Sequence, residues 1–191
     1  MEGSQLFQHR SSLFSGKLWM ITLIPMIASL TPLILTAHER QPIEVIPPII
    51  ILALAFGLIA FIQLEYRLHF AEIKFRFRPF VRWKTAALND YSEVQILKIS
   101  PMKEFGGWGL RYGSRLGKAY TSHGKHILHF VPKDGQKPKL MSSWKPGQPF
   151  NLSIKESELD AVEQALKATG IKVTRQTDCV DGHRRLALSK R

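Results

Sequence analysis

The chain has 191 residues, and its 27 Lys and Arg residues against 15 Asp and Glu residues give a formal net charge of +12. Hydrophobic residues make up 45% of the chain and charged residues 22%, which excludes a disordered acidic segment and a collagen-like repeat. The single cysteine, Cys179, excludes an internal disulfide and a cysteine-rich zinc module.

Charge and apolarity are segregated along the chain. Residues 1–64 hold three basic and three acidic side chains, so the whole positive excess lies in residues 65–191. Two uncharged segments of 20 residues, about 18–37 and 45–64, match the length that a helix needs to cross a hydrocarbon core of about 30 Å. We therefore expect a cytoplasmic segment over 1–17 and a transmembrane helical hairpin over 18–64.

The distribution of basic residues predicts the orientation of this hairpin. The loop between the two segments carries only Arg40, whereas six cations follow the second segment within 20 residues: Arg67, Lys74, Arg76, Arg78, Arg82 and Lys84. Basic residues accumulate on the cytoplasmic side of a membrane. The pattern therefore predicts that both termini are cytoplasmic.

The region after residue 64 changes to a period of two, which is typical of half-buried strands. Apolar and polar side chains alternate over 66–70 and again over 73–78, and Pro79 is expected to end the second strand. Five further strands are expected at 94–99, 108–112, 118–121, 127–131 and 139–142.

A single amphipathic helix is expected from about Glu156 to Ala168, because Leu159, Val162 and Leu166 share one face. Antiparallel strands followed by one helix predict an α+β domain over 65–170, a small barrel or bent sheet covered by that helix. Residues 171–191 are basic with little apolar periodicity, and we expect them to form a flexible tail.

Three stretches carry a resemblance: Phe77-Arg78-Pro79-Phe80 with Trp83-Lys84, Phe105-Gly106-Gly107-Trp108-Gly109-Leu110-Arg111-Tyr112-Gly113, and Gly117-Lys118-Ala119-Tyr120. With them, residues 15–168 resemble small, uncharacterised bacterial integral membrane proteins that have two N-terminal transmembrane helices and a pleckstrin-homology-like domain. The resemblance implies an antiparallel pleckstrin-homology-like small barrel with one C-terminal helix, in a multi-pass protein of the bacterial inner membrane. It implies no ligand, and the chain departs from the pattern over 141–152.

The glycine-rich segment is the first candidate site. It comprises Gly106, Gly107, Trp108 and Gly109, with Arg111 beside it. It lacks the Gly-Lys-Ser/Thr ending of a nucleotide-binding P-loop and a following helix. Glycines at the start of a strand more often mark a bulge or a tight turn. The segment is therefore interpreted as structural, with a ligand or partner loop as the alternative.

Catalytic and metal chemistry find little support in the sequence. His123, His126 and His129 are spaced three apart, but on a strand His126 and His129 point to opposite faces and cannot converge on a metal. Ser142, Ser143 and Cys179 lack a recognisable base and orienting group around them. We expect no enzymatic activity, no cofactor and no metal.

The six cations after residue 64 are the second candidate site. Anionic lipid head groups of a phospholipid bilayer attract such residues, although the same charges could serve only topology and solubility. Nucleic acid is not expected, because the aromatic residues alternate with the cations and should point into the core. The sequence therefore predicts a non-enzymatic membrane protein whose cytosolic module binds anionic lipid or an unknown protein partner. The alternatives are an accessory subunit of a membrane complex and an enzyme with an unrecognised site.

Overall fold

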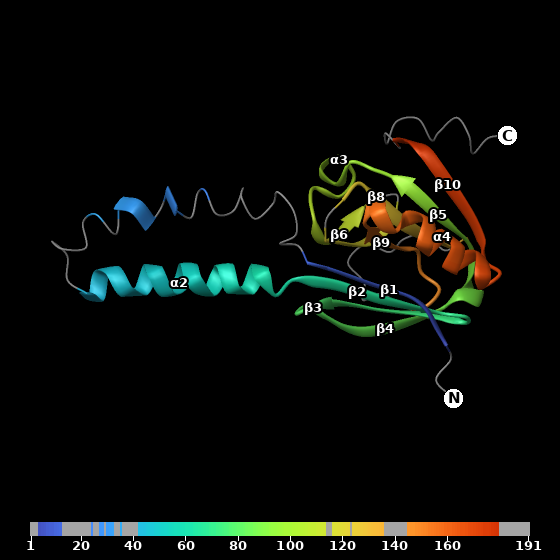
Figure 1. Ribbon diagram of the computed structural model, residues 1–191, viewed down its shortest axis with the longest axis horizontal. Helices are drawn as coiled ribbons and strands as arrows, with labels where there is room; N and C mark the ends of the chain where they lie inside the picture. The colour runs from blue at the N-terminus through green and yellow to red at the C-terminus, as the bar shows by residue number, and fades with distance from the viewer. Residues whose placement is uncertain are drawn as a thin grey trace.

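The computed structural model describes residues 4–12, 24, 27–28, 30–32, 35, 42–113, 116–122, 124–135 and 145–179. Two β-sheets with a core between them form the body of the molecule, and a long helix, α2 (Pro42–Ala60), projects from it (Figure 1).

The first sheet has the order β1-β2-β3-β4, with every neighbouring pair antiparallel. Its strands are β1 (Gln5–Ser12), β2 (Gln63–His69), β3 (Glu72–Arg78) and β4 (Val81–Ala87). The alternation read from the sequence explains β2 and β3. Tyr66, Phe75 and Phe77 are at most 1% exposed, while the residues that alternate with the buried ones in each strand face outwards. The strands predicted over 66–70 and 73–78 are thus confirmed.

The second sheet has six strands in the order β10-β5-β8-β9-β7-β6. They are β5 (Tyr91–Lys98), β6 (Gly109–Gly113), β7 (Gly117–Thr121), β8 (His126–Pro132), β9 (Phe150–Ile154) and β10 (Lys172–Cys179). Two of the pairings are parallel, β10 with β5 and β7 with β9, and the others are antiparallel. The predicted strands 94–99, 108–112, 118–121 and 127–131 correspond to β5, β6, β7 and β8, whereas 139–142 lies outside the described residues.

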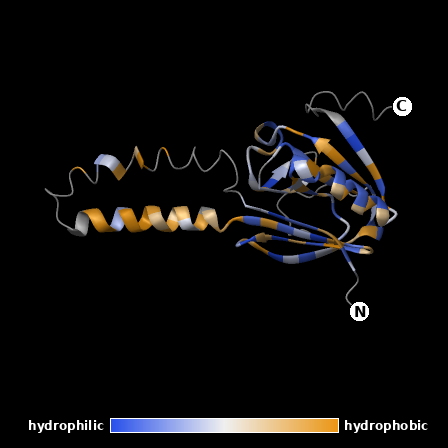
Figure 2. Ribbon diagram, viewed as in Figure 1, coloured by the Kyte–Doolittle hydropathy of each residue, from blue (hydrophilic) through white to orange (hydrophobic). Residues whose placement is uncertain are grey.

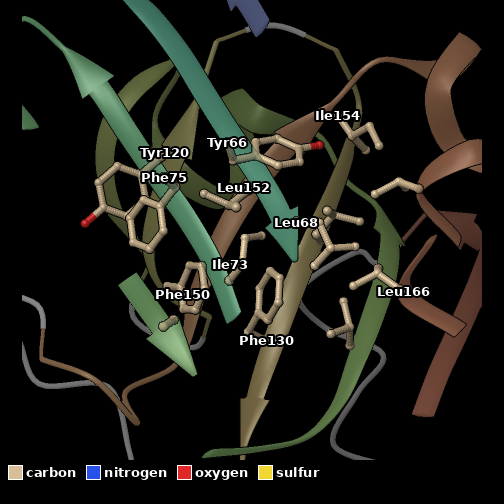
Figure 3. Packing of buried hydrophobic residues seen from close by; sticks show 14 of the residues in the cluster. Tyr66, Leu68, Ile73, Phe75, Tyr120, Phe130, Phe150, Leu152, Ile154 and Leu166 are labelled. Atoms are coloured by element: carbon tan, nitrogen blue, oxygen red, sulfur yellow. The ribbon is translucent and has the colours of Figure 1, made fainter. Parts of the chain in front are cut away.

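Aromatic side chains from both sheets fill the space between them (Figure 3). The ring of Phe150 stacks on Phe130, with centroids 4.3 Å apart, and on Phe75 of the first sheet, at 4.9 Å. Tyr91 meets Phe130 and Phe150 edge to face. These contacts join β3 to β8 and β9, so the two sheets share one core.

The C-terminal helix closes one end of this core. Helix α4 (Leu159–Ala168) follows a turn of 3-10 helix, η2 (Glu156–Glu158), and buries Leu159, Val162 and Leu166 against the core. The predicted helix and its apolar face are confirmed. The flexible tail expected over 171–191 is wrong for its first part, because β10 pairs with β5; the remainder lies outside the described residues.

The predicted transmembrane hairpin is wrong. Among the described residues, no helix is both long enough and apolar enough to cross a membrane. Helix α2 ends at Ala60, and Leu64 is a buried residue of β2, so the uncharged segment 45–64 contributes to two different elements. Figure 2 shows that α2 is hydrophobic over most of its length. Large apolar side chains of α2, such as Ile51, Leu54 and Leu58, are exposed. Most of the first predicted span, 18–37, lies outside the described residues.

Corrections of fold and location follow from this. The described N-terminal segment forms a strand, β1, which pairs with β2 in the first sheet. Two sheets with parallel as well as antiparallel pairs replace the antiparallel pleckstrin-homology-like small barrel. The predicted identity as an integral, multi-pass inner-membrane protein with cytoplasmic termini depended on the hairpin and is overturned with it. The alternative of an accessory subunit anchored by the hairpin is overturned for the same reason.

Candidate functional site

The solvent side of the first sheet, which we call the outer face, gathers most of the predicted cations. Its side chains include those of Arg10, Gln63, Glu65, Arg67, Glu72, Lys74, Arg76, Arg78 and Trp83. Five cations stand against two carboxylates on this face. The alternation of β2 and β3 produces it, since each inward apolar residue is followed by an outward charged one.

A buried carboxylate organises the centre of the outer face. Glu65 is 5% exposed and accepts hydrogen bonds from Arg76 Nε (2.9 Å), Arg76 Nη2 (2.5 Å) and Arg67 Nη2 (3.2 Å). Burial by itself would raise the pKa of Glu65, but the hydrogen bonds and charges of Arg76 and Arg67 outweigh it and hold the pKa below its usual value. The carboxylate therefore stays ionised and fixes both guanidinium groups.

Trp83 completes this cluster. The guanidinium carbons of Arg76 and Arg67 lie 4.5 and 5.0 Å from the centroid of the Trp83 ring, within the range of cation–π attraction. Trp83 is 39% exposed, so an aromatic ring remains at the surface among cations. The sequence analysis did not predict a role for Trp83 at the surface, because it considered only the aromatic residues of β3, which are buried.

The remaining predicted cations do not all belong to the outer face. Arg10 belongs to the outer face although it was not predicted there, and its Nη2 donates from β1 to Gln63 Oε1 of β2 at 3.0 Å. Lys84 pairs with Phe75 and so lies on the inner side of β4. Burial, followed by the charge of Lys118 on the second sheet, lowers the pKa of Lys84. Arg82 is exposed on β4.

The glycine-rich segment follows a short helix, α3 (Pro101–Phe105), and leads into β6. Gly106 ends α3 with φ +69°, a backbone conformation that favours glycine. Gly113 is required by close packing, because a Cβ there would lie 2.7 Å from the Phe105 ring. Arg111 Nε donates to the carbonyl of Trp108 at 3.0 Å, so this side chain forms a hydrogen bond within the segment. These contacts favour a structural role; the alternative of a partner loop stays a prediction.

A second polar cluster, which the sequence did not reveal, lies between the sheets. We call it the polar network: Glu158, His9, Ser11, Ser122 and Ser153. The Glu158 carboxylate contacts His9 Nδ1 closely, and His9 Nε2 lies 2.9 Å from Ser11 Oγ. Ser122 Oγ lies 2.5 Å from Ser11 Oγ and 3.1 Å from Ser153 Oγ.

This network runs from β1 through the residue after β7 to β9 and η2, and its members other than Glu158 are at most 2% exposed. The His9 ring also stacks on Tyr66, with centroids 4.7 Å apart. Burial lowers the pKa of His9, and it outweighs the hydrogen bond and charge of Glu158, which act in the opposite direction. His9 is therefore neutral at neutral pH.

The order carboxylate, imidazole, hydroxyl is also that of an acyl-transfer triad. In such a site the serine oxygen must reach a substrate carbonyl. Here Ser11 is 2% exposed and its oxygen already contacts the hydroxyl of Ser122. The arrangement is thus suited to joining buried strands and not to attacking a substrate.

The histidines on β8 have separate surroundings. His129 Nδ1 lies 2.8 Å from Asn151 Oδ1, and Asn151 Nδ2 donates to the carbonyl of Leu116 at 2.7 Å. His123 lies outside the described residues. Within the described part of the chain, no three His, Cys, Asp or Glu side chains are placed to hold a metal ion.

Comparison with known proteins did not identify a related family or sequence. No protein-family model matches the chain, and no curated protein sequence matches it. The resemblance to small bacterial membrane proteins is therefore overturned, by this result and by the two-sheet fold that begins with a strand.

Proposed function

We propose that this chain is a non-enzymatic binding module whose outer face binds anionic phospholipid head groups. The observation that carries the proposal is the excess of positive charge on the solvent side of one sheet, where Arg10, Arg67, Lys74, Arg76 and Arg78 outnumber Glu65 and Glu72. An array of cations spread over three strands suits a surface of repeated phosphate groups better than it suits one small ligand.

Electrostatic magnitudes support an interaction of this kind. Each Lys or Arg close to an anionic lipid surface contributes about 1 kcal/mol. An excess of three charges corresponds to about 3 kcal/mol, or on the order of a hundredfold in partitioning. Exposed charges are screened within about 10 Å at ordinary salt, so the attraction should weaken as salt is added.

The same face suits single-stranded nucleic acid less well. Base stacking needs exposed aromatic rings along a basic groove. Phe75 and Phe77 are at most 1% exposed, and the ring of Trp83 already has two guanidinium groups over it. We therefore propose lipid phosphate, and not nucleic acid, as the ligand.

The test measures flotation of the full-length protein with vesicles of phosphatidylcholine alone and with added phosphatidylserine. We expect binding to rise with phosphatidylserine and to fall with salt. The triple variant Arg67→Glu, Lys74→Glu and Arg78→Glu should lose this dependence on anionic lipid. The matched control is Lys125→Glu, Lys133→Glu and Lys145→Glu, which changes the charge equally at exposed lysines outside the first sheet. Equal loss in both variants, or equal binding of the wild type to both vesicles, would overturn the proposal.

A further inference from the structure

The N-terminal strand β1 is the edge strand of the first sheet, and it has two kinds of attachment. Its backbone pairs with β2 alone. Its inward side chains His9 and Ser11 belong to the polar network, which reaches Ser122 and Ser153 of the second sheet region and Glu158 of η2. The polar network is therefore the buried hydrogen-bonded connection that the described residues show from β1 to the second sheet. At the surface, Lys155 Nζ also donates to the Arg10 carbonyl at 3.4 Å, and Phe7 packs against the core.

The hydrogen-bond order in the polar network fits a neutral imidazole. A carboxylate only accepts, so His9 Nδ1 carries the proton that it donates to Glu158. In a neutral imidazole, Nε2 then accepts from the Ser11 hydroxyl. Ser11 Oγ in turn accepts from Ser122, and Ser122 Oγ accepts from Ser153. Every hydroxyl of the network has an acceptor in this arrangement.

Protonation of His9 breaks that order. Nε2 would become a donor to Ser11, whose own hydroxyl would turn to Ser122, and the Ser122 hydroxyl would turn to Ser153. Ser153 Oγ already accepts from the Ser122 backbone N–H at 2.9 Å. In that arrangement the Ser153 hydroxyl has no acceptor left within the polar network, and an unsatisfied buried donor is costly.

The charges around His9 do not compensate for this loss. The titratable and charged groups that face it are Glu158 from η2, Lys155 just before η2, and Tyr66 from β2. Glu158 favours the protonated ring, whereas Lys155 and burial oppose it. Tyr66 offers an aromatic ring, and its hydroxyl is buried with no hydrogen-bond partner among the described residues. Removal of the ring from water is the largest of these effects.

We infer that the polar network is a pH-sensitive attachment, which holds β1 on the core at neutral pH and releases it when His9 takes up a proton. Release of β1 would remove Arg10 from the outer face and uncover the backbone edge of β2. The inference does not depend on the identity of any ligand, so it stands or fails separately from the proposed function.

Amide hydrogen exchange on the full-length protein tests the inference. Protection factors, corrected for intrinsic exchange, are compared for β1 and for β8 at about pH 7.5 and about pH 5, on either side of the ordinary histidine pKa. We expect protection of β1 to fall at least about fivefold while β8 stays protected, because opening of β1 is linked to proton uptake. In His9→Gln, which cannot be protonated, the β1 difference should disappear.

Two further measurements keep the test decisive. His126→Gln changes another half-buried histidine, on β8, and should leave the pH response of β1 intact. The ¹⁵N chemical shifts of the wild-type imidazoles give the protonation state of His9 directly, even if His9→Gln folds poorly. A doubly protonated His9 ring at neutral pH, or β1 protection that is the same at both pH values, would overturn the inference.

Discussion

The outer face and the polar network both place a carboxylate beside a basic side chain, but the basic side chains differ in how much water reaches them. On the outer face, Glu65 is held by two guanidinium groups whose side chains are 19% and 41% exposed. In the polar network, Glu158 reaches a histidine whose side chain is fully buried. Similar residue types thus give a surface that can meet a ligand in one place and a connection between strands in the other.

Exposure also decides how much each cluster contributes to stability. Ion pairs at a surface typically contribute less than about 1 kcal/mol, because water and salt compete for them. A buried hydroxyl that loses its partner costs about 1–3 kcal/mol. The exposed cations of the outer face should therefore tolerate substitution, whereas the interior should not. Four changes, ordered from the largest expected effect, test the two regions.

Phe150→Ala should produce the largest loss, on the interior side of the comparison. Its ring stacks on Phe75 and Phe130 and so joins the two sheets. Removing such a ring leaves a cavity and should cost about 3–5 kcal/mol of unfolding free energy. Urea unfolding monitored by circular dichroism measures the effect. Lys74→Ala on the outer face is the control, and a comparable loss there would contradict the proposed difference.

Ser122→Ala should cost about 1–3 kcal/mol, because it leaves Ser11 and Ser153 without a shared hydroxyl partner. The matched control is Ser92→Ala, which removes an exposed hydroxyl that donates to the carbonyl of Val131 at 3.2 Å. We expect the control to stay within about 0.5 kcal/mol of wild type. Equal unfolding free energies for the two variants would show that the network adds no stability.

The polar network also explains where sequence reasoning succeeded and failed. In β2 and β3 the inward residues are apolar, so alternation predicted the strands and their buried face. In β1 the inward residues include His9 and Ser11, whose polarity hides the period of two. Tertiary contacts give them a reason to be buried: Ser11 contacts Ser122, 111 positions away in sequence, and His9 contacts Glu158, 149 positions away. No local pattern carries that information.

Other failures have equally physical causes. Among the side chains of β10 whose burial is described, Val173 is the one partly buried apolar residue packed on the core, so its sequence looked like a basic tail. The absence of charge over 45–64 indicated one continuous element, but it did not mark the point where α2 ends and β2 begins. Four of the five cations of the outer face were predicted, all but Arg10, whereas the role of Glu65 in fixing Arg67 and Arg76 depends on side-chain contacts that no local pattern shows.

The pH dependence of stability should separate the two clusters. The pKa of His9 is lowered, mainly by burial, so below its ordinary value of 6.5 the unfolded chain binds more protons than the folded chain. Stability is then fully present above pH 6.5 and falls as the pH decreases toward the folded pKa. His126 acts in the same direction, also mainly through burial. Glu65, with a lowered pKa, keeps its contribution until the pH falls below its ordinary 4.5.

Unfolding in urea at about pH 7.5 and about pH 5.5 measures this effect above the range in which Glu65 titrates. We expect the wild type to lose stability between the two values. His9→Gln should lose less, and the double variant with His126→Gln less still. A wild-type loss that His9→Gln leaves unchanged would assign the pH response to groups outside the polar network.

Glu65→Gln should have the smallest effect, and its direction is informative. The carboxylate competes with lipid phosphate for Arg67 and Arg76, so its neutral isostere should strengthen binding to phosphatidylserine vesicles by about fivefold, or about 1 kcal/mol. Glu72→Gln removes an equal charge from the same face but contacts only Lys74 among these cations, at 3.0 Å. Glu156→Gln lies outside the sheet and should change little. If Glu65 and Glu72 behave alike, the outer face acts as a uniform layer of charge; if Glu65 has the larger effect, the cluster around Trp83 is the point at which lipid phosphate binds.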